Sequence, residues 1–272
     1  MTLPDLSLII AVYNKPEVLR LVLAACSRQT LRDFEIIVAD DGSGDEVADV
    51  IADARRLFRL PISHQWQEDI GWRKNEILNK AVRSATSEYL VFTDGDCLPE
   101  KNFLFDHRRE REPGRVLLGR RVEMSERWSN SLTLDNILSG RFEQIGLSEL
   151  IDGIKGQALR LEDRIRITST FLRRISSQRA KGILGSNFSV HRADIVAING
   201  FDEEYDGPGH GEDSDIQYRL SLIGVKGKSL RNLAIQFHVY HPRTAPFETT
   251  LKRFEEVRRA GIPRCKYGLE KL

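Results

Sequence analysis

The sequence predicts an α/β protein built on a mostly parallel central sheet with helices on both faces. In the first hundred residues, short apolar runs alternate with amphipathic segments, so the order is strand, helix, strand, helix. The strand-like runs are almost continuously apolar, which is typical of parallel strands covered on both faces. In such sheets ligands bind beyond the carboxyl ends of the strands. We therefore expect the functional site where polar clusters follow the strands.

The N-terminal elements follow each other closely. Residues 6–12, "LSLIIAV", read as the first strand, and 15–29 as an amphipathic helix with a proline near its start. Residues 34–40 form a second strand, and the polar turn after it opens a second helix. A third helical stretch covers 71–85 and a further strand 88–94.

The second half is less regular. Residues 100–181 have weaker periodicity and are rich in arginine. A strand-like rhythm returns at 182–192 and is followed by a short helix. A glycine-rich loop with acids at a helix start covers 207–224, and a strand covers 233–242. The tail, 243–272, is expected to be helical.

Composition excludes several classes of protein. The 272 residues carry a formal net charge of +1, which gives no global electrostatic argument for a nucleic-acid partner. Cys26, Cys97 and Cys265 lie far apart and form no CxxC pair, so a disulfide framework or zinc knuckle is not expected. No apolar run approaches the ~18 residues of a transmembrane span, and the N-terminus does not resemble a signal peptide. The sequence indicates a cytoplasmic enzyme.

Two carboxylates follow the strand in "YLVFTDGDCLP". Asp94 and Asp96, separated by Gly95, can face one hard cation such as Mg²⁺ or Mn²⁺. A calcium loop is excluded, because Pro99 and Phe105 stand where that loop needs glycine and glutamate. A plain polar turn remains the alternative.

A second acidic cluster lies in "GPGHGEDSD". Glu212, Asp213 and Asp215 fall at a helix start, where a carboxylate could act as general base toward a hydroxyl. Acids at this place can also simply cap the helix. The glycines before them suggest a backbone that a ligand approaches closely.

Two histidines end the last strand. His238 and His241, in "FHVYHP", are candidate metal ligands, although buried structural histidines are common. In an extended segment their side chains point to opposite faces, so we expect only one to reach a given ion.

Basic residues begin the third helix. Arg73, Lys74 and Asn75 follow "EDIGW". Basic side chains there oppose the helix dipole, so contact with an anionic ligand is the functional interpretation and a solvated face the alternative.

In this order the motifs resemble family 2 of the inverting nucleotide-sugar glycosyltransferases, which have the Rossmann-like GT-A fold. The resemblance rests on "SLIIAVYNK", "EIIVADDGSGD", "EDIGWRKNEILNKAVRSATSEYLVFTDGDCLP", "GSNFSVHRADIVAINGFDEEYDGPGHGEDSDIQYRL" and "FHVYHP". The second half resembles the galactosyltransferase-type C-terminal region of bacterial chondroitin-polymerase-like enzymes. The resemblance covers the chain except for about 105–181.

The resemblance implies a single GT-A domain over 1–272 with a role for each motif. Residues 1–104 would bind the nucleotide sugar, and 105–242 would bind the acceptor and carry catalysis. The implied donor-binding residues are Val12, Tyr13, Asn14, Asp41, Arg73, Asn75, Asp94, Gly95 and Asn187. Among these, Asp41 would bond the base, Arg73 would contact the nucleotide, and Asn187 would face the donor sugar.

The resemblance also implies the chemistry. Asp96 would bind Mn²⁺ or Mg²⁺ on the diphosphate, with His238 or, second, His241 as a further ligand. Asp213 would be the catalytic base and Glu212 would support a sugar. The implied partners are a nucleotide-sugar donor, UDP-linked in most such relatives, and a glycan or lipid-linked acceptor of surface polysaccharide biosynthesis. Relatives often carry a tryptophan where this chain has Pro208, which puts aromatic stacking on the acceptor in doubt.

Other classes remain as alternatives. A nucleotidyltransferase would need a glycine-rich phosphate loop at the first strand, which "AVYNKPEVL" is not. A non-catalytic carbohydrate-binding module would not need Asp96, Asp213 and His238 together, and hydrolysis of the donor would release free sugar. Residues 158–181 carry seven basic and two acidic residues. They fit a solvated face or, as a hypothesis, peripheral contact with an anionic membrane surface.

Overall fold

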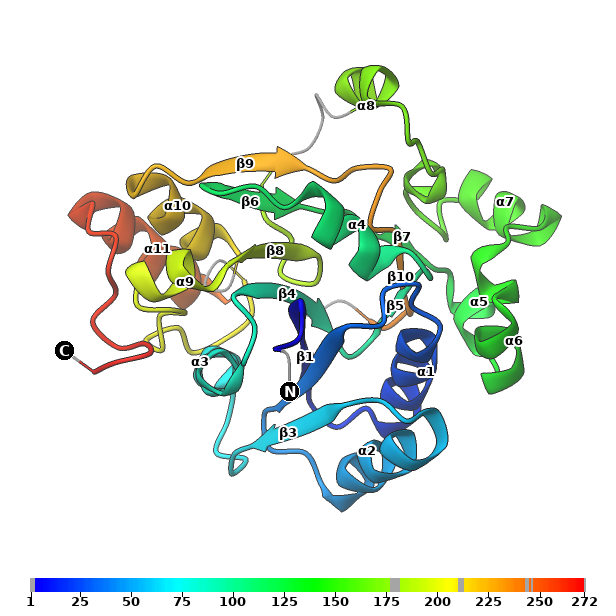
Figure 1. Ribbon diagram of the computed structural model, residues 1–272, viewed down its shortest axis with the longest axis horizontal. Coiled ribbons are helices and arrows are strands. Elements are labelled where there is room, and N and C mark those ends of the chain that lie inside the picture. The colour runs from blue at the N-terminus through cyan, green and yellow to red at the C-terminus, as the bar shows by residue number, and fades with distance from the viewer. Residues whose placement is uncertain (1–2, 177–181, 210–212, 243–244, 246, 272) are drawn as a thin grey trace.

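The computed structural model describes residues 3–176, 182–209, 213–242, 245 and 247–271 (Figure 1). Its strands are β1 (Leu6–Val12), β2 (Phe34–Asp40), β3 (Ile62–Trp66), β4 (Tyr89–Asp94), β5 (Cys97–Pro99), β6 (Arg115–Leu118), β7 (Val122–Glu123), β8 (Phe188–His191), β9 (Lys226–Ser229) and β10 (Gln236–His238). Its α-helices are α1 (Pro16–Ser27), α2 (Asp45–Phe58), α3 (Lys74–Ser84), α4 (Phe103–Glu110), α5 (Glu126–Asn130), α6 (Leu134–Ser139), α7 (Leu147–Ile154), α8 (Thr170–Ser176), α9 (Arg192–Ala197), α10 (Ser214–Leu222) and α11 (Glu248–Ala260).

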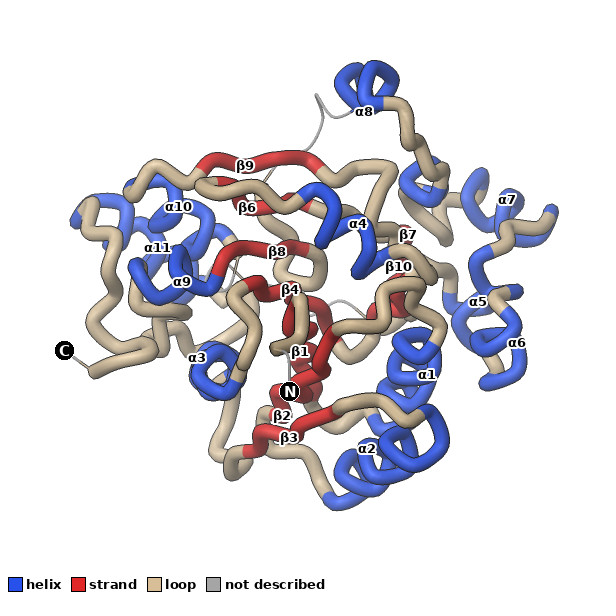
Figure 2. Tube along the Cα trace, viewed as in Figure 1, coloured by secondary structure: helices blue, strands red, loops and turns tan. Residues whose placement is uncertain are grey.

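A mostly parallel sheet runs through the centre of the molecule (Figure 2). Its strand order is β3-β2-β1-β4-β8-β6-β9. β1 pairs in parallel with both β2 and β4, whereas β8 runs antiparallel to both of its neighbours. The chain runs outward from β1 through β2 to β3 and then returns to β4 on the other side of β1, so a ligand crevice is expected at the carboxyl ends of β1 and β4, where the strand order reverses.

Alternation along β1 explains why helices cover both faces. Leu8 and Ile10 belong to the core that α1 and α2 complete. Ile9 and Ala11 belong to the core on the other face, which α3, α9 and α10 complete. Side chains in a strand alternate between faces, so a strand buried on both sides must be apolar throughout. The predicted α/β class with helices on both faces is confirmed.

A small second sheet places the end of β4 against the C-terminal half. Its order is β5-β10-β7, with β10 antiparallel to β5 and parallel to β7. β5 begins directly after Asp96, so the turn that contains Asp94 and Asp96 lies between the two sheets. The strand expected over 233–242 is shorter, ending at His238, and belongs to this small sheet.

Helices α5–α8 lie on the opposite side of the molecule from α9–α11 (Figure 1). Part of the basic charge of 158–181 is used inside the protein. Arg166 bonds both carboxylate oxygens of Asp106, and Arg173 pairs with Glu110. Within the described residues, every helix is too short or too polar to cross a bilayer.

Candidate active site

A cleft of about 540 Å³ opens at the carboxyl ends of β1, β2 and β4. Its lining includes Val12, Tyr13, Asp41, Lys74, Asp94 and Asp96. Four of these six side chains are charged, although the sheet behind them is apolar. The largest group of residues predicted from the sequence therefore lies beyond the carboxyl ends of the strands, where parallel sheets bind their ligands.

Two glycines permit the close packing that forms the cleft. At Gly95 a Cβ atom would lie 3.1 Å from the carbonyl oxygen of Ala11, and the Gly95 N–H donates to that oxygen at 2.7 Å. Gly42 has a φ of +96°, and a Cβ there would lie 2.7 Å from the backbone of Asp69. Asp69 can therefore accept a hydrogen bond from the Tyr13 hydroxyl at 2.9 Å. Glycine is needed at position 42 because a side chain there would collide with the backbone of Asp69, and at position 95 a side chain would be tightly packed against Ala11.

Asp41 lines the cleft directly after the carboxyl end of β2. Its two carboxylate oxygens accept hydrogen bonds from Gln67 Nε2, at 2.5 Å, and from the Arg73 backbone N–H, at 3.0 Å. Burial raises the pKa of Asp41, while these two hydrogen bonds oppose the rise. The carboxylate is therefore held in one orientation, as a group that recognises a ligand must be.

Asp94 and Asp96 have different partners although one residue separates them. Asp94 accepts from Lys74 Nζ at 2.8 Å, and Asp96 accepts from Lys15 Nζ at 2.8 Å. Asp94 continues strand β4, whereas Asp96 turns toward the small sheet. The two carboxylates thus belong to two separate groups of side chains.

Asp96 lies between two imidazoles. Its Oδ1 is 3.6 Å from His238 Nε2, and its Oδ2 is 3.4 Å from His241 Nε2. Both imidazoles approach Asp96 because β10 ends at His238 and strand alternation stops there. That only one histidine reaches a given ion stays a prediction, and the group of three close ligand atoms contains His238 and not His241. Burial acts to raise the pKa of Asp96, but His238 and Lys15 outweigh it and hold the value at about 2.

The residues around Asp96 fit a divalent metal ion. Asp96 and His238 are both more than 90% buried, and a third potential ligand, the thiol of Cys97, lies beside them. One ligand atom from each of these three residues lies within 4.8 Å of the others. Carboxylate and imidazole are common ligands of first-row divalent cations. His241 lies at the more exposed rim of the same group.

Asp213 is the N-cap of α10. Its Oδ1 accepts a hydrogen bond from the Ser214 N–H at 2.6 Å. Burial raises the pKa of Asp213, while the hydrogen bonds from Ser214 and the charge of Lys74 act to lower it. Lys74 lines the cleft, so a single lysine lies close enough to influence both Asp94 and Asp213.

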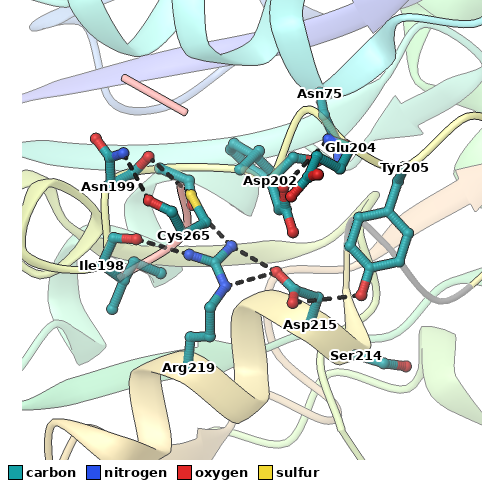
Figure 3. Close-up of polar contacts among 12 residues, drawn as sticks. Asn75, Ile198, Asn199, Asp202, Glu204, Tyr205, Ser214, Asp215, Arg219 and Cys265 are labelled. Carbon is teal, nitrogen blue, oxygen red and sulfur yellow. Dashed lines mark hydrogen bonds and ion pairs between the residues drawn. The ribbon is translucent and has the colours of Figure 1, made fainter. Parts of the chain in front are cut away.

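The neighbouring acid Asp215 has a structural role. Arg219 donates to its Oδ2 through Nε at 2.7 Å, and the Tyr205 hydroxyl donates to its Oδ1 at 3.3 Å (Figure 3). Arg219 also donates to the carbonyl oxygens of Ile198 and Gly200, so the guanidinium ties α10 to the end of α9. Glu212 lies outside the described residues.

Four of the expected donor-binding residues do not line the cleft with their side chains. Asn187 is fully buried, and its amide donates to the carbonyls of Arg120 and Ala234. Asn75 is 1% exposed and donates to the carbonyl of Asp202 at 2.7 Å (Figure 3).

The other two, Arg73 and Asn14, support the cleft from outside. The Arg73 side chain turns to Glu76 and to the carbonyl of Glu68, while its backbone N–H orients Asp41. Asn14 adopts a φ of 47°, and its Oδ1 accepts from Gly44 N at 3.2 Å.

The structure adds an aromatic side chain that sequence reasoning missed. Phe247 lines the cleft with Pro208, and its N–H donates to the Pro208 carbonyl at 3.0 Å. A Cβ at Gly207 would lie 2.2 Å from the Phe247 ring, so glycine is required for this contact. An aromatic ring from the residue before α11 thus lies against the glycine loop.

A second cavity of about 800 Å³ shares His241 with the cleft. Glu123 and His238 also line it, together with residues of α5 and Tyr240. Glu123 could not be identified as a site residue from the sequence, because it lies in the stretch of weak periodicity. It reaches His238 only through the pairing of β7 with β10.

Comparison with known proteins decides the family. Residues 7–174 match the family described as glycosyl transferase family 2. The chain belongs to glycosyl transferase family 2. Residues 172–242 of this glycosyltransferase match the family described as N-terminal domain of galactosyltransferase.

Relatives and solved structures agree with this assignment. The chain is 30% identical over 228 residues to validoxylamine A glucosyltransferase of Streptomyces hygroscopicus subsp. jinggangensis, covering 82% of this chain and 52% of that protein. It is 25% identical over 248 residues to chondroitin synthase of Escherichia coli, covering 89% and 36%. The chain therefore spans about half or less of these relatives.

Two solved structures have the same fold. Residues 1–349 of S. aureus TarS in complex with UDP-GlcNAc match with a TM-score of 0.62 and 20% identity, covering 94% of this chain and 65% of that one. The mannosyltransferase PcManGT from Pyrobaculum calidifontis, in complex with GDP-Man and Mn²⁺, matches with a TM-score of 0.58 and 16% identity, covering 89% and 59%. The GT-A glycosyltransferase fold is confirmed.

Proposed function

We propose that this glycosyltransferase moves a sugar from a UDP-linked donor to a hydroxyl of a glycan or lipid-linked acceptor, with inversion and with the help of Mn²⁺ or Mg²⁺. Its likeness to a chondroitin synthase supports a role in surface polysaccharide synthesis as part of this proposal. The observation that carries the proposal is the arrangement around the cleft: Asp41, the Asp96–histidine group, and Lys74, whose charge also acts on Asp213.

The cleft is suited to a nucleoside diphosphate sugar. Asp41 is an oriented acceptor for the N–H groups of a base. Val12 and Tyr13 offer surface on one wall, and Lys74 brings positive charge toward an anionic donor. Phe247 offers a ring face at the opening, where a sugar can stack.

Asp96 and His238 would hold the metal ion, with His241 at the rim. When bound, the ion neutralises the diphosphate and so makes the nucleotide a better leaving group. Lys15, which pairs with Asp96 at 2.8 Å, lies close enough to turn toward phosphate oxygens once Asp96 has another partner.

Asp213 would accept the proton of the acceptor hydroxyl. Burial raises its pKa, which brings it closer to that of the hydroxyl it must deprotonate in the transition state. Attack from the side opposite the leaving nucleotide inverts the configuration of the sugar. Asp215 is already paired with Arg219, which leaves Asp213 as the base among the described acids of this loop.

The acceptor needs its own space near the cleft. The cavity of about 800 Å³ that shares His241 is lined by Glu123, His238 and residues of α5 and not by Asp213, so it adjoins the metal side of the cleft.

A thermal-shift panel of nucleotide sugars with and without Mn²⁺ tests the proposal. A donor at 100 times its Kd stabilises a protein by about 2.7 kcal/mol, which corresponds to a Tm increase of about 5 °C or more for a chain of this size. We expect this increase for a UDP-sugar only when Mn²⁺ is present. Stabilisation by no UDP-sugar, or by a GDP-sugar alone, would refute the donor assignment.

A further inference from the structure

Three side chains form a row across the small sheet. Cys97 of β5 pairs directly with His238 of β10, and His238 pairs directly with Glu123 of β7. Directly paired residues project from the same face, with Cβ atoms about 4.5–5.5 Å apart. Asp96 precedes Cys97 and brings its carboxylate to the same place.

Glu123 fixes how His238 is presented. His238 Nδ1 lies 3.2 Å from Glu123 Oε2, and Arg121 Nε donates to the other oxygen of Glu123 at 3.0 Å. A carboxylate that accepts from Nδ1–H leaves the lone pair of Nε2 for a metal ion, as in the carboxylate–histidine–metal arrangement. Nε2 points to Asp96, whose Oδ1 lies 3.6 Å away.

The thiol of Cys97 lies at the same point. Its Sγ donates to Asp96 Oδ1 at 3.5 Å, so Oδ1 is near both sulfur and nitrogen. Ligand atoms around a tetrahedral zinc ion are separated by about 3.3–3.7 Å, given metal–ligand distances of about 2.0–2.3 Å. The observed separations of 3.5 and 3.6 Å are in this range.

We propose that Cys97 is a third protein ligand, so that the centre combines oxygen, nitrogen and sulfur and takes Zn²⁺ or Co²⁺ in addition to harder cations. Coordination replaces the thiol proton, which leaves to solvent. Thiolate favours Zn²⁺ and its analogues, whereas Mg²⁺ and Mn²⁺ prefer oxygen ligands. A role of Cys97 in catalysis rests on the proposed metal-dependent transfer. Coordination of a metal ion by Cys97 does not depend on that proposal.

Within the part of the chain that the structure describes, Asp96, Cys97 and His238 form the one set of three such groups close enough to share an ion. All three are buried, which separates them from acidic clusters at the surface. The other cysteines provide controls. Cys26 belongs to the apolar core beneath α1, and Cys265 donates to the Asn199 carbonyl.

Cobalt spectroscopy tests the proposal. The wild-type chain is titrated with Co²⁺, together with Cys97→Ser and the controls Cys26→Ala and Cys265→Ala. We expect a near-ultraviolet thiolate-to-cobalt charge-transfer band at one equivalent in the wild type and both controls. The band is lost in Cys97→Ser, and its Zn²⁺ affinity falls by about tenfold or more. A wild type without the band, or a Cys97→Ser variant that retains it, overturns the proposal.

A second measurement needs no variant. X-ray absorption at the zinc edge of the wild-type chain should show one sulfur neighbour at about 2.3 Å. A shell of nitrogen and oxygen alone refutes the role of Cys97. That result would leave Mn²⁺-dependent donor binding intact, whereas a sulfur shell without donor binding would refute the proposed function instead.

Discussion

Replacement of Asp213 by asparagine separates catalysis from folding. Asp213 caps α10 by accepting the Ser214 N–H, and asparagine caps helices about as well as aspartate does. We therefore expect the free energy of unfolding to change by less than about 0.5 kcal/mol. An amide cannot take a proton from the acceptor, so transfer should fall by about 10²- to 10⁴-fold, or about 2.7–5.4 kcal/mol in the barrier.

The assay is the initial rate of nucleoside diphosphate release at saturating donor, alongside donor affinity and Tm. The matched variant Asp215→Asn carries the same change two residues away. Because Arg219 would keep a buried charge without its partner, we expect a loss of about 3–5 kcal/mol in stability. Wild-type transfer by Asp213→Asn would show that Asp213 is not the base.

Three further predictions follow from the same contacts. Asp41→Ala removes the oriented carboxylate that would accept from the base, so donor affinity measured by calorimetry should fall by about 1–3 kcal/mol. Because burial raises the pKa of Asp213, kcat should fall on acidification at a higher pH than an exposed aspartate would give. Arg219→Met leaves Asp215 buried and unpaired, so denaturant unfolding should show a loss of about 3–5 kcal/mol.

Each of these predictions can fail in its own way. Unchanged donor affinity in Asp41→Ala would remove this carboxylate from the donor site. A kcat that stays constant down to the usual pKa of aspartate would mean that protonation of Asp213 does not limit the reaction. An Arg219→Met variant as stable as the wild type would show that the network behind α10 does not determine stability.

The sequence predicted the large sheet well because its strands are buried on both faces. β1, β2 and β4 are almost wholly apolar, so their position and length followed from composition. β3 was missed because it carries polar and partly exposed residues at the edge of the sheet. β5 and β7 are only three and two residues long and are defined by pairing between distant segments, which local periodicity does not report. β10 was expected within a longer strand over 233–242, but it ends at His238.

The same difference between local sequence patterns and long-range contacts applies to the site. Asp94 and Asp96 were predicted as candidates because they lie at the end of a buried strand, and Asp41 was implied by the family resemblance. The burial of Asn187 and Asn75 depends on partners about 50 or more residues away, so it could not be predicted from their local motifs. For the same reason, the contribution of Phe247 could not be predicted from its own surroundings in the sequence.

The proposed mechanism depends most on the assignment of metal binding to Asp96 and not to Asp94. Calorimetric titration of the UDP-sugar found in the panel, with and without Mn²⁺, tests it in the wild type, Asp96→Asn and Asp94→Asn. We predict that Mn²⁺ tightens binding by about tenfold or more in the wild type and in Asp94→Asn. It should have no effect in Asp96→Asn. An Asp96→Asn variant that responds to Mn²⁺ as the wild type does would contradict the account.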